Sequence, residues 1–483
     1  MDWFVIVKPF RTREAAYASM IRTARNARNC DRVFRRCDDA GHSRTKRLDD
    51  ARLLVAARVA SGESLLKLHV TDEDARRWII ASLFIGFGQQ LYVVLRNQLV
   101  HDLGLPMAFL GVVQGMGAAT GVAAGVVGLW LLPRFPVAWA LRAGVLANSA
   151  GFAMQVAATR GWHFVLGAAA AGVGIQMLTM ASGPFLAGRV TERDRVRTYA
   201  LQMVAIQTAP GFLGAVLGGE LQRAVSAASA SAVGGHRVAL AVGAASVALA
   251  LLPLRRLARR EAPRRQSQPL RLDELRRFAL FLAPDAVLHF GAGLAVPFLQ
   301  VYLRVVHGAP PHYVGWYFGA MMVAGTLTNL AAPLIADRLG NVRALALLQV
   351  GAAIGFLGLA TAETTGFAAL ALVARYACSV AAIPLWTAAL HANLAPGDGE
   401  IASSWRMVVQ SVAWAAANLF AGLALTGGAD ALRVLFLVAA AAQVLAAWGC
   451  WRSLAALARR REEATLSDGG CDGRAGRGQR RRS

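Results

Sequence analysis

The sequence predicts an all-α membrane protein with twelve transmembrane helices in two parallel six-helix halves. Three observations lead to this prediction: an apolar composition, twelve apolar stretches long enough to span a bilayer, and an internal repeat. Of the 483 residues, 56% are hydrophobic and only 16% are charged. A soluble domain is about half apolar and about a quarter charged, so both values indicate a chain surrounded by lipid.

The apolar stretches follow one another along most of the chain. A helix needs roughly 20 apolar residues to cross the hydrocarbon core. Because unpaired backbone groups are too costly in lipid, each stretch is expected to be helical. The predicted spans are 78–96, 107–131, 137–157, 162–184, 198–222, 236–254, 277–302, 313–335, 343–362, 366–390, 402–425 and 432–452.

The polar segments divide the chain. A cytoplasmic linker at 255–276 is expected to separate an N-terminal half, 76–254, from a C-terminal half, 277–455. Residues 1–75 form a basic extension that is either disordered or the product of an upstream start, and 456–483 form a basic tail. Thr71-x-x-Asp74 resembles a capping box and predicts where the first helix begins.

The formal net charge of +23 is concentrated in the tails and connections. We expect the protein in the inner (cytoplasmic) membrane of the cell. The positive-inside rule then predicts that both termini lie in the cytoplasm. The inner connections carry Arg134, Arg142, Arg189, Arg193, Arg195, Arg197, the run 255–277, Arg338, Arg343 and Arg406. The outer connections carry Arg96, Arg160, Arg223, Arg237, Arg304 and Arg433. No basic–aromatic pattern of a nucleic-acid-binding module accompanies these charges, so we expect no nucleic-acid partner.

Motifs for catalysis or cofactor binding are missing from the sequence. It contains no G-x-x-x-x-G-K-[ST] loop and no H-E-x-x-H pair. The five cysteines, none in a C-x-x-C pair, are interpreted as unpaired thiols. We therefore expect no enzyme activity, no catalytic residue, no metal and no cofactor.

An internal repeat appears when the chain is shifted by 204 residues. Four glycine pairs and one proline pair then coincide, together with Arg134 and Arg338. The shift superposes Gly104, Pro106, Gly111, Gly115 and Gly121 on Gly308, Pro310, Gly315, Gly319 and Gly325. It places the second span on the eighth in the same direction, which predicts parallel halves with a substrate path between them. Small residues four apart, as in Gly117-x-x-x-Gly121-x-x-x-Gly125, predict close helix packing.

The segment 332–343, APLIADRLGNVR, is similar to the signature loop of the major facilitator superfamily, G-x-x-x-D-R-x-G-R-[RK]. Asp337, Arg338 and Gly340 occupy the expected places, Arg343 supplies a basic residue after the glycine, and Ala332-Pro333 stands where a glycine is usual. The resemblance covers 76–455 and implies a transporter. The equivalent loop of the first half departs from the pattern, with Pro133 and Pro136 in place of its acid and glycine.

The resemblance implies a gating role for this loop. The acid of such a loop docks on a helix N-terminus of the other half, where free N–H groups favour an anion. Asp337 should therefore face the start of the fifth span, near Arg197 and Thr198. The alternative is a solvated acid in a turn.

Three ionisable groups fall inside predicted spans, where a charge costs at least about 2.5–3.5 kcal/mol and marks a functional candidate. Asp285 and His289 are four residues apart, on one helix face. They are candidates for proton coupling or, alternatively, a structural pair. Arg375 is a candidate for binding an anionic substrate or for pairing with an acid such as Asp285.

Polar and aromatic residues in the spans are candidates to line a cavity, although each one alone more often serves in packing. Such a lining suits a moderately hydrophobic small molecule. The candidates are Gln89, Gln90, Tyr92, Gln114, Gln176, Trp386, Trp414 and Asn418.

The function that these observations favour is a secondary active transporter that moves a small solute by alternating access and uses protons as coupling ion. We expect a monomer in the lipid bilayer. Two alternatives remain at this point: a sensor that keeps the carrier fold without transport, and an intramembrane enzyme.

Overall fold

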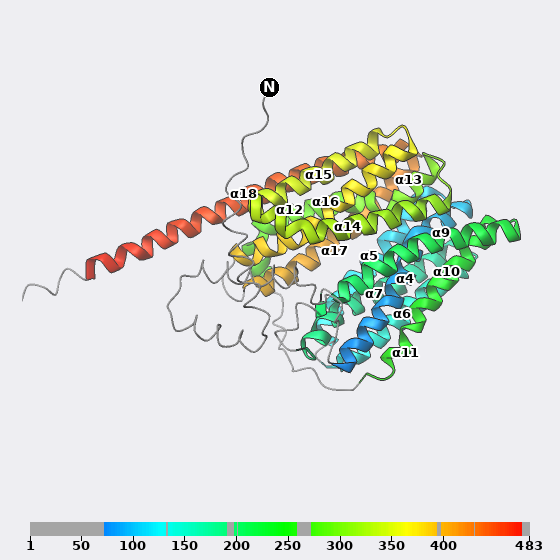
Figure 1. Ribbon diagram of the computed structural model, residues 1–483, viewed down its shortest axis with the longest axis horizontal. Coiled ribbons are helices and arrows are strands. Elements are labelled where there is room, and N and C mark those ends of the chain that lie inside the picture. Colours follow the sequence, from blue (N-terminus) through cyan, green and yellow to red (C-terminus); the bar gives the residue numbers. More distant parts are fainter. Residues whose placement is uncertain are drawn as a thin grey trace, which may run out of the picture. The chain divides into compact units, whose positions relative to one another are not determined.

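The structure is a computed structural model that describes residues 72–131, 134–190, 198–199, 201–257, 272–393, 398–428 and 430–475. Every regular element in this part of the chain is a helix (Figure 1). The predicted extension 1–75, apart from 72–75, lies outside the described residues, as do Arg197 and most of the linker 255–276.

All twelve predicted spans are helical. The N-terminal half comprises α4 (Glu73–Asp102), α5 (Met107–Leu131), α6 (Val137–Val156), α7 (Gly161–Ala187), the π-helical turn η1 (Val204–Thr208), α9 (Ala209–Ser229), α10 (Ala232–Leu249) and α11 (Leu251–Leu254). The C-terminal half comprises α12 (Leu272–Ala295), the 3₁₀ turn η2 (Val296–Phe298), α13 (Leu299–Val305), α14 (Pro311–Leu339), α15 (Asn341–Thr361), α16 (Thr365–Asn393), α17 (Asp398–Ala424), η3 (Leu425–Gly427) and α18 (Asp430–Ala475).

Eleven of the described helices are long and apolar enough to cross a membrane by length and composition alone. The remaining span is α6, whose 20 residues include Arg142, Asn148 and Gln155. These polar side chains lower its hydropathy, but Asn148 and Gln155 are buried in the bundle, and Arg142 donates to the carbonyls of Leu254 and Leu257 at 3.0 Å. The polar residues of α6 therefore face protein.

Two helix ends differ from the prediction. The side chain that caps α4 is Asp72, whose Oδ1 accepts from the Ala75 N–H at 2.8 Å, and Asp74 lies within the first turn. A short carboxylate at this position satisfies an N–H group that has no partner inside the helix. The last helix, α18, continues to Ala475 and passes beyond the predicted span end at residue 452 (Figure 1).

The two halves repeat each other in detail. In the N-terminal half α7 packs on α5 and α6, and in the C-terminal half α16 packs on α14 and α15. Thr120 of α5 donates to the Ala169 carbonyl at 3.0 Å, and Thr328 of α14 donates to the Ala377 carbonyl at 2.9 Å. Both bonds span 49 residues of chain, so the same kind of bond joins corresponding helices, displaced by one helical turn from the repeat of 204 residues.

The turns after the first and seventh spans also correspond. Gly104 and Gly308, which the repeat superposes, have φ values of +71° and +63°. A residue with a side chain rarely adopts this left-handed conformation, which explains glycine at both places. We call the end of the bundle that carries these two turns the outer end, and the opposite end the inner end.

Two seams join the halves: α5 packs on α17, and α9 packs on α14. These two pairs are equivalent by the internal repeat, because the shift of 204 residues superposes α5 on α14 and α9 on α17. Gly111 meets Gly422 in the first seam, with an added Cβ on Gly422 only 2.8 Å from the Gly111 Cα. Gly315 lies against Ala215 and Gly219 in the second. Without side chains, the backbones approach closely.

The predicted glycine stripe of α5 has the packing role expected of it, but within one half. Gly117 and Gly121 face Ala168 and Gly172 of α7, and Gly125 faces the Gln176 side chain. The stripe therefore fixes α5 on α7 and lies off the seam with α17.

Candidate functional site

Asp285 lies on α12 with a side chain that is only 1% exposed, and it is bound by two residues of α17. Its carboxylate accepts from Arg406 twice, from Nε at 3.1 Å and from Nη2 at 3.2 Å. Gln410 adds a bond from Nε2 at 3.1 Å. A buried carboxylate is stable in lipid when it is paired in this bidentate way and its remaining lone pairs are used.

His289 is one helical turn beyond Asp285, as the i, i+4 spacing predicts. Its Nδ1 lies 2.8 Å from the Asp285 carbonyl and 3.6 Å from the Asp285 carboxylate. The imidazole therefore hydrogen-bonds the backbone of its own helix and borders the ion pair. The structure thus brings Asp285 and His289 to one place, with Arg406 and Gln410 as additional partners.

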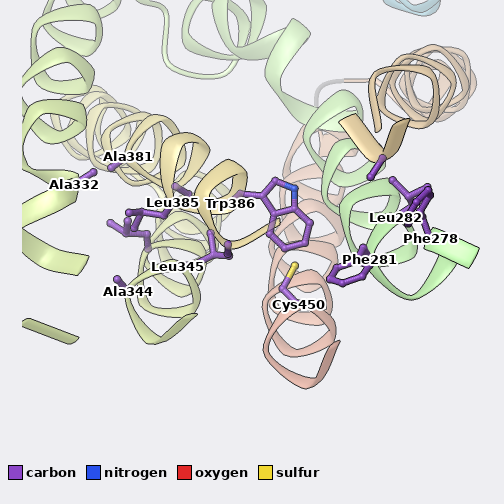
Figure 2. Packing of buried hydrophobic residues seen from close by; sticks show 14 of the residues in the cluster. Phe278, Phe281, Leu282, Ala332, Ala344, Leu345, Ala381, Leu385, Trp386 and Cys450 are labelled. Atoms are coloured by element: carbon purple, nitrogen blue, oxygen red, sulfur yellow. The ribbon is translucent and has the colours of Figure 1, made fainter. Parts of the chain in front are cut away.

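An aromatic and apolar shell surrounds the ion pair. The Arg406 guanidinium lies 5.6 Å from the centre of the Trp386 ring, in cation–π range. Trp386 of α16, Phe281 of α12 and Cys450 of α18 belong to one buried cluster (Figure 2). The cluster joins α12, α16, α17 and α18, and its Trp386 contacts the Arg406 side of the ion pair.

Arg375 lies apart from this ion pair. It is 4% exposed, and its guanidinium lies 5.0 Å from the centre of the Phe356 ring. A Cβ added to Gly355 of α15 would lie 2.4 Å from the Arg375 Cβ, so α15 and α16 pack closely at this point. The acid suggested as a partner of Arg375 was Asp285, and Asp285 pairs with Arg406 rather than with Arg375. Among the described residues no carboxylate pairs with Arg375.

The predicted cavity residues separate into two groups. Gln114 lies at the junction of the halves, with its Nε2 3.5 Å from the Pro297 carbonyl, and the Asn418 backbone borders Gly111 in the α5–α17 seam. The Trp414 carbonyl accepts from the Asn418 side chain at 2.8 Å.

The other predicted cavity residues pack within one half. The Tyr92 ring stacks on Phe152 of α6 at 3.6 Å, and the Gln90 Cβ borders Gly214 of α9. Gln176 packs on α5, Trp386 lies in the C-terminal cluster, and Gln89 is half-buried on α4.

The residues of the predicted gating loop lie at the inner end. Asp337 and Arg338 are in the last turn of α14, and Arg343 is in the first turn of α15. Gly340 between the two helices has φ +80°, which explains the glycine of the motif. Thr198 is buried, and Arg197 is outside the described residues, so the contact of Asp337 with the fifth span stays a prediction.

Sequence reasoning missed Arg406 and Gln410. The orientation argument assigned Arg406 to an inner connection, whereas the structure places it inside α17 against Asp285. The available signal was its position within the predicted span 402–425, with Gln410 one helical turn further on the same face.

Comparison with known proteins gives similarity at the level of structure alone. No protein-family model matches the sequence, and no curated protein matches it. A bacterial homologue of the human lysosomal transporter Spinster, in an inward-facing and unoccupied conformation, has a TM-score of 0.66 at 14% identity, over 80% of this chain and 97% of that one. The nucleoside transporter NupG has a TM-score of 0.61 at 16% identity, over 79% and 98%. A D-xylose–proton symporter has 0.62 at 15%, over 78% and 97%.

These neighbours are major facilitator superfamily transporters. This chain has the major facilitator fold. The Asp285 ion pair joins two helices of one half, α12 and α17. One of these helices, α17, also forms a seam with the other half.

Proposed function

We propose that the chain is a secondary active transporter that moves a small solute across the membrane by alternating access and is coupled to protons. The observation that carries the proposal is the buried Asp285 ion pair, because an ionisable group within the bilayer marks a coupling or substrate site. The proton-coupled neighbour, a D-xylose–proton symporter, is consistent with it but is only 15% identical.

The proposed coupling runs from Asp285 through α17 to the seam. Ionised Asp285 holds Arg406 and Gln410, which keeps α17 on α12. A proton on the carboxylate removes the charge that Arg406 compensates and weakens this link. Because Gly422 of the same helix packs on Gly111 of α5, a shift of α17 changes how the halves meet. Protonation is thereby linked to which end is open.

In this proposal the structure represents a state closed at its outer end. Hydrogen bonds that join described residues of the two halves connect them from the outer end to the middle of the bundle, from Asn97–Pro297 to Thr208–Thr326. We assign the inner end to the cytoplasm from the positive-inside rule, so a state open at that end would admit solute from the cytoplasm. A contact of Asp337 with the fifth span would close the inner end.

The proposal is tested with the purified full-length protein in proteoliposomes. A panel of nucleosides, pentoses, carboxylates and lipophilic amines is first screened for a rise in melting temperature, since a ligand stabilises the folded state that binds it. Uptake of each binding compound is then measured with and without an inside-alkaline pH gradient. The gradient should accelerate uptake by the parent chain.

Asp285→Asn should abolish the effect of the gradient while leaving binding of the compound measurable. The matched control is Asp273→Asn, which neutralises an exposed acid at the start of the same helix and should keep the effect. Uptake by Asp285→Asn that still follows the gradient would remove Asp285 from coupling. Binding without uptake for every compound would favour the sensor.

A further inference from the structure

An apolar groove lies between α4, α9 and α10, three neighbouring helices of the N-terminal half (Figure 1). It has a volume of about 660 Å³, which is within the usual range of sites for small molecules. Helix α4 contributes Ile80, Leu83, Phe84 and Phe87, all in the half of this helix nearer the inner end. The groove therefore belongs to the leaflet at that end, and we call it the inner groove.

The lining of the inner groove suits hydrocarbon. Leu213 of α9 and Val242 and Leu249 of α10 stand beside the α4 residues, and their side chains are 46%, 41% and 45% exposed. Among the described lining residues Ser246 carries the only hydroxyl, and it already donates to the Phe84 carbonyl at 2.9 Å. A polar ligand would lose its hydrogen bonds to water in such a groove, whereas an alkyl chain would not.

Exposed arginines mark the inner end of the groove on two of its helices. Arg76 precedes Ile80 by four residues and shares its face of α4. On the other side the lining ends with Leu249, and Arg256 follows directly after α11. Arg77, the neighbour of Arg76, donates to the Arg256 carbonyl at 2.8 Å. This bond places the two exposed arginines at the same mouth of the groove.

The acids at this mouth are already bound. Glu73 accepts from Arg77 at 2.5 Å, and Asp74 accepts from Arg77 at 2.9 Å. The carboxylate that caps α4 bonds to the helix backbone. The side chains of Arg76 and Arg256 form no hydrogen bond or ion pair with the part of the chain that the structure describes. Two positive charges are therefore available to an external anion beside an apolar groove.

The corresponding place in the C-terminal half has a different construction. The repeat superposes Ile80 and Ala245, which line the groove, on Pro284 and Gly449. There the helices meet, because an added Cβ on Gly449 would lie 2.9 Å from the Pro284 Cγ. Leu280 stands at the position of the arginine on α4. One half thus combines an open groove with this arginine, and the other has close packing and a leucine, which indicates that groove and arginine serve together.

From these observations we propose that the inner groove binds one anionic phospholipid, with an acyl chain in the groove and its phosphate at Arg76 and Arg256. Arginine forms strong charge-assisted bonds to phosphate. The positive-inside rule assigns this end to the cytoplasmic leaflet, whose anionic lipids attract basic residues beside a membrane span. Charge and apolar contact act together here, which distinguishes this lipid from those that merely surround the protein. The site goes beyond the proposed function, since it requires neither solute nor proton.

The test measures lipid binding by native mass spectrometry of the purified full-length protein in detergent. The protein is titrated with dioleoylphosphatidylglycerol and, in parallel, with dioleoylphosphatidylcholine, which has the same chains and no net charge. The first molecule of the anionic lipid should bind at the lower concentration. Arg76→Gln and Arg256→Gln should each weaken its binding by about fivefold, the usual contribution of one arginine near a charged membrane surface.

A separate variant tests the acyl chain. Ala245 is exposed and lines the groove, so Ala245→Phe fills the groove without overpacking the core. It should lower the affinity for phosphatidylglycerol to that for phosphatidylcholine, although both arginines remain. The matched control is Ala241→Phe, which adds the same ring at an exposed position of α10 outside the lining. Arg452→Gln, at an exposed position of α18, is the control for charge. Both controls should bind the anionic lipid as the parent chain does.

Each outcome decides the proposal. Weaker binding in the arginine variants and in Ala245→Phe, with unchanged controls, supports the site. Equal affinity for the two lipids would overturn the phosphate contact, and loss in the arginine variants alone would show attraction to the surface and overturn the groove. All five substituted positions are exposed, so the melting temperatures without added lipid should equal that of the parent. Because the titration involves no transport, the lipid site and the proposed proton-coupled uptake can fail independently.

Discussion

Replacing Gly111 by alanine should force α5 away from α17 and destabilise the protein by about 1–3 kcal/mol, the usual cost of overpacking. An added Cβ would overlap the Gly422 backbone and lie 2.7 Å from the Asn418 carbonyl. Both obstacles are backbone atoms, which cannot move aside as a flexible side chain can. The effect is measured as a drop of several degrees in the melting temperature of the purified protein.

Gly366→Ala is the matched control. An added Cβ on Gly366 has nothing within 4 Å, and the residue lies in the first turn of α16. Alanine there should cause no loss of stability, since it is the better helix former. Equal melting temperatures for the Gly111 and Gly366 variants would show that the seam is not packed as described.

Replacing Arg406 by glutamine should have the largest effect of any single substitution in the site. It leaves the Asp285 carboxylate buried with Gln410 as its remaining partner from α17. Removing one member of a buried ion pair costs about 3–5 kcal/mol, because the other charge stays buried without compensation. We expect poor expression or a strongly lowered melting temperature.

The double variant Asp285→Asn with Arg406→Gln should recover most of this loss, because two neutral amides can hydrogen-bond without an unpaired charge. Arg223→Gln is the control, because it removes the exposed ion pair of Arg223 with Glu220 and exposed pairs contribute little to stability. A double variant no more stable than Arg406→Gln would mean that Arg406 acts through packing on Trp386 rather than through Asp285.

The fold could be predicted because lipid imposes simple rules on a sequence. Long apolar stretches must be helical, and glycines at a constant spacing reveal the repeat. The helix ends were less predictable. The prediction ended the first and seventh spans at residues 96 and 302, whereas α4 reaches Asp102 and α13 reaches Val305. Asp102 and Arg304, which form an ion pair, therefore lie beyond the predicted span ends, where helix geometry gives no reason to pair them.

Part of the site could be predicted, and part could not, because only local helix geometry can be read from a single sequence. The i, i+4 spacing placed Asp285 and His289 on one face because helix geometry is local. The partner of Asp285 depends on which helix packs on α12 and in what register, and a single sequence does not contain that information. Arg375 illustrates the difference: pairing with Asp285 was a reasonable suggestion until the α12–α17 packing placed Arg406 there.

Distances between spin labels on the two halves would show whether the two ends open alternately. One pair, at Thr159 and Glu363, reports on the outer end, and a second pair, at Phe135 and Leu339, reports on the inner end; all four residues are exposed. We predict two populations in which a longer outer distance accompanies a shorter inner one, and Asp337→Asn should favour the population open at the inner end. A single population at both ends, or two distances that lengthen together, would contradict alternating access.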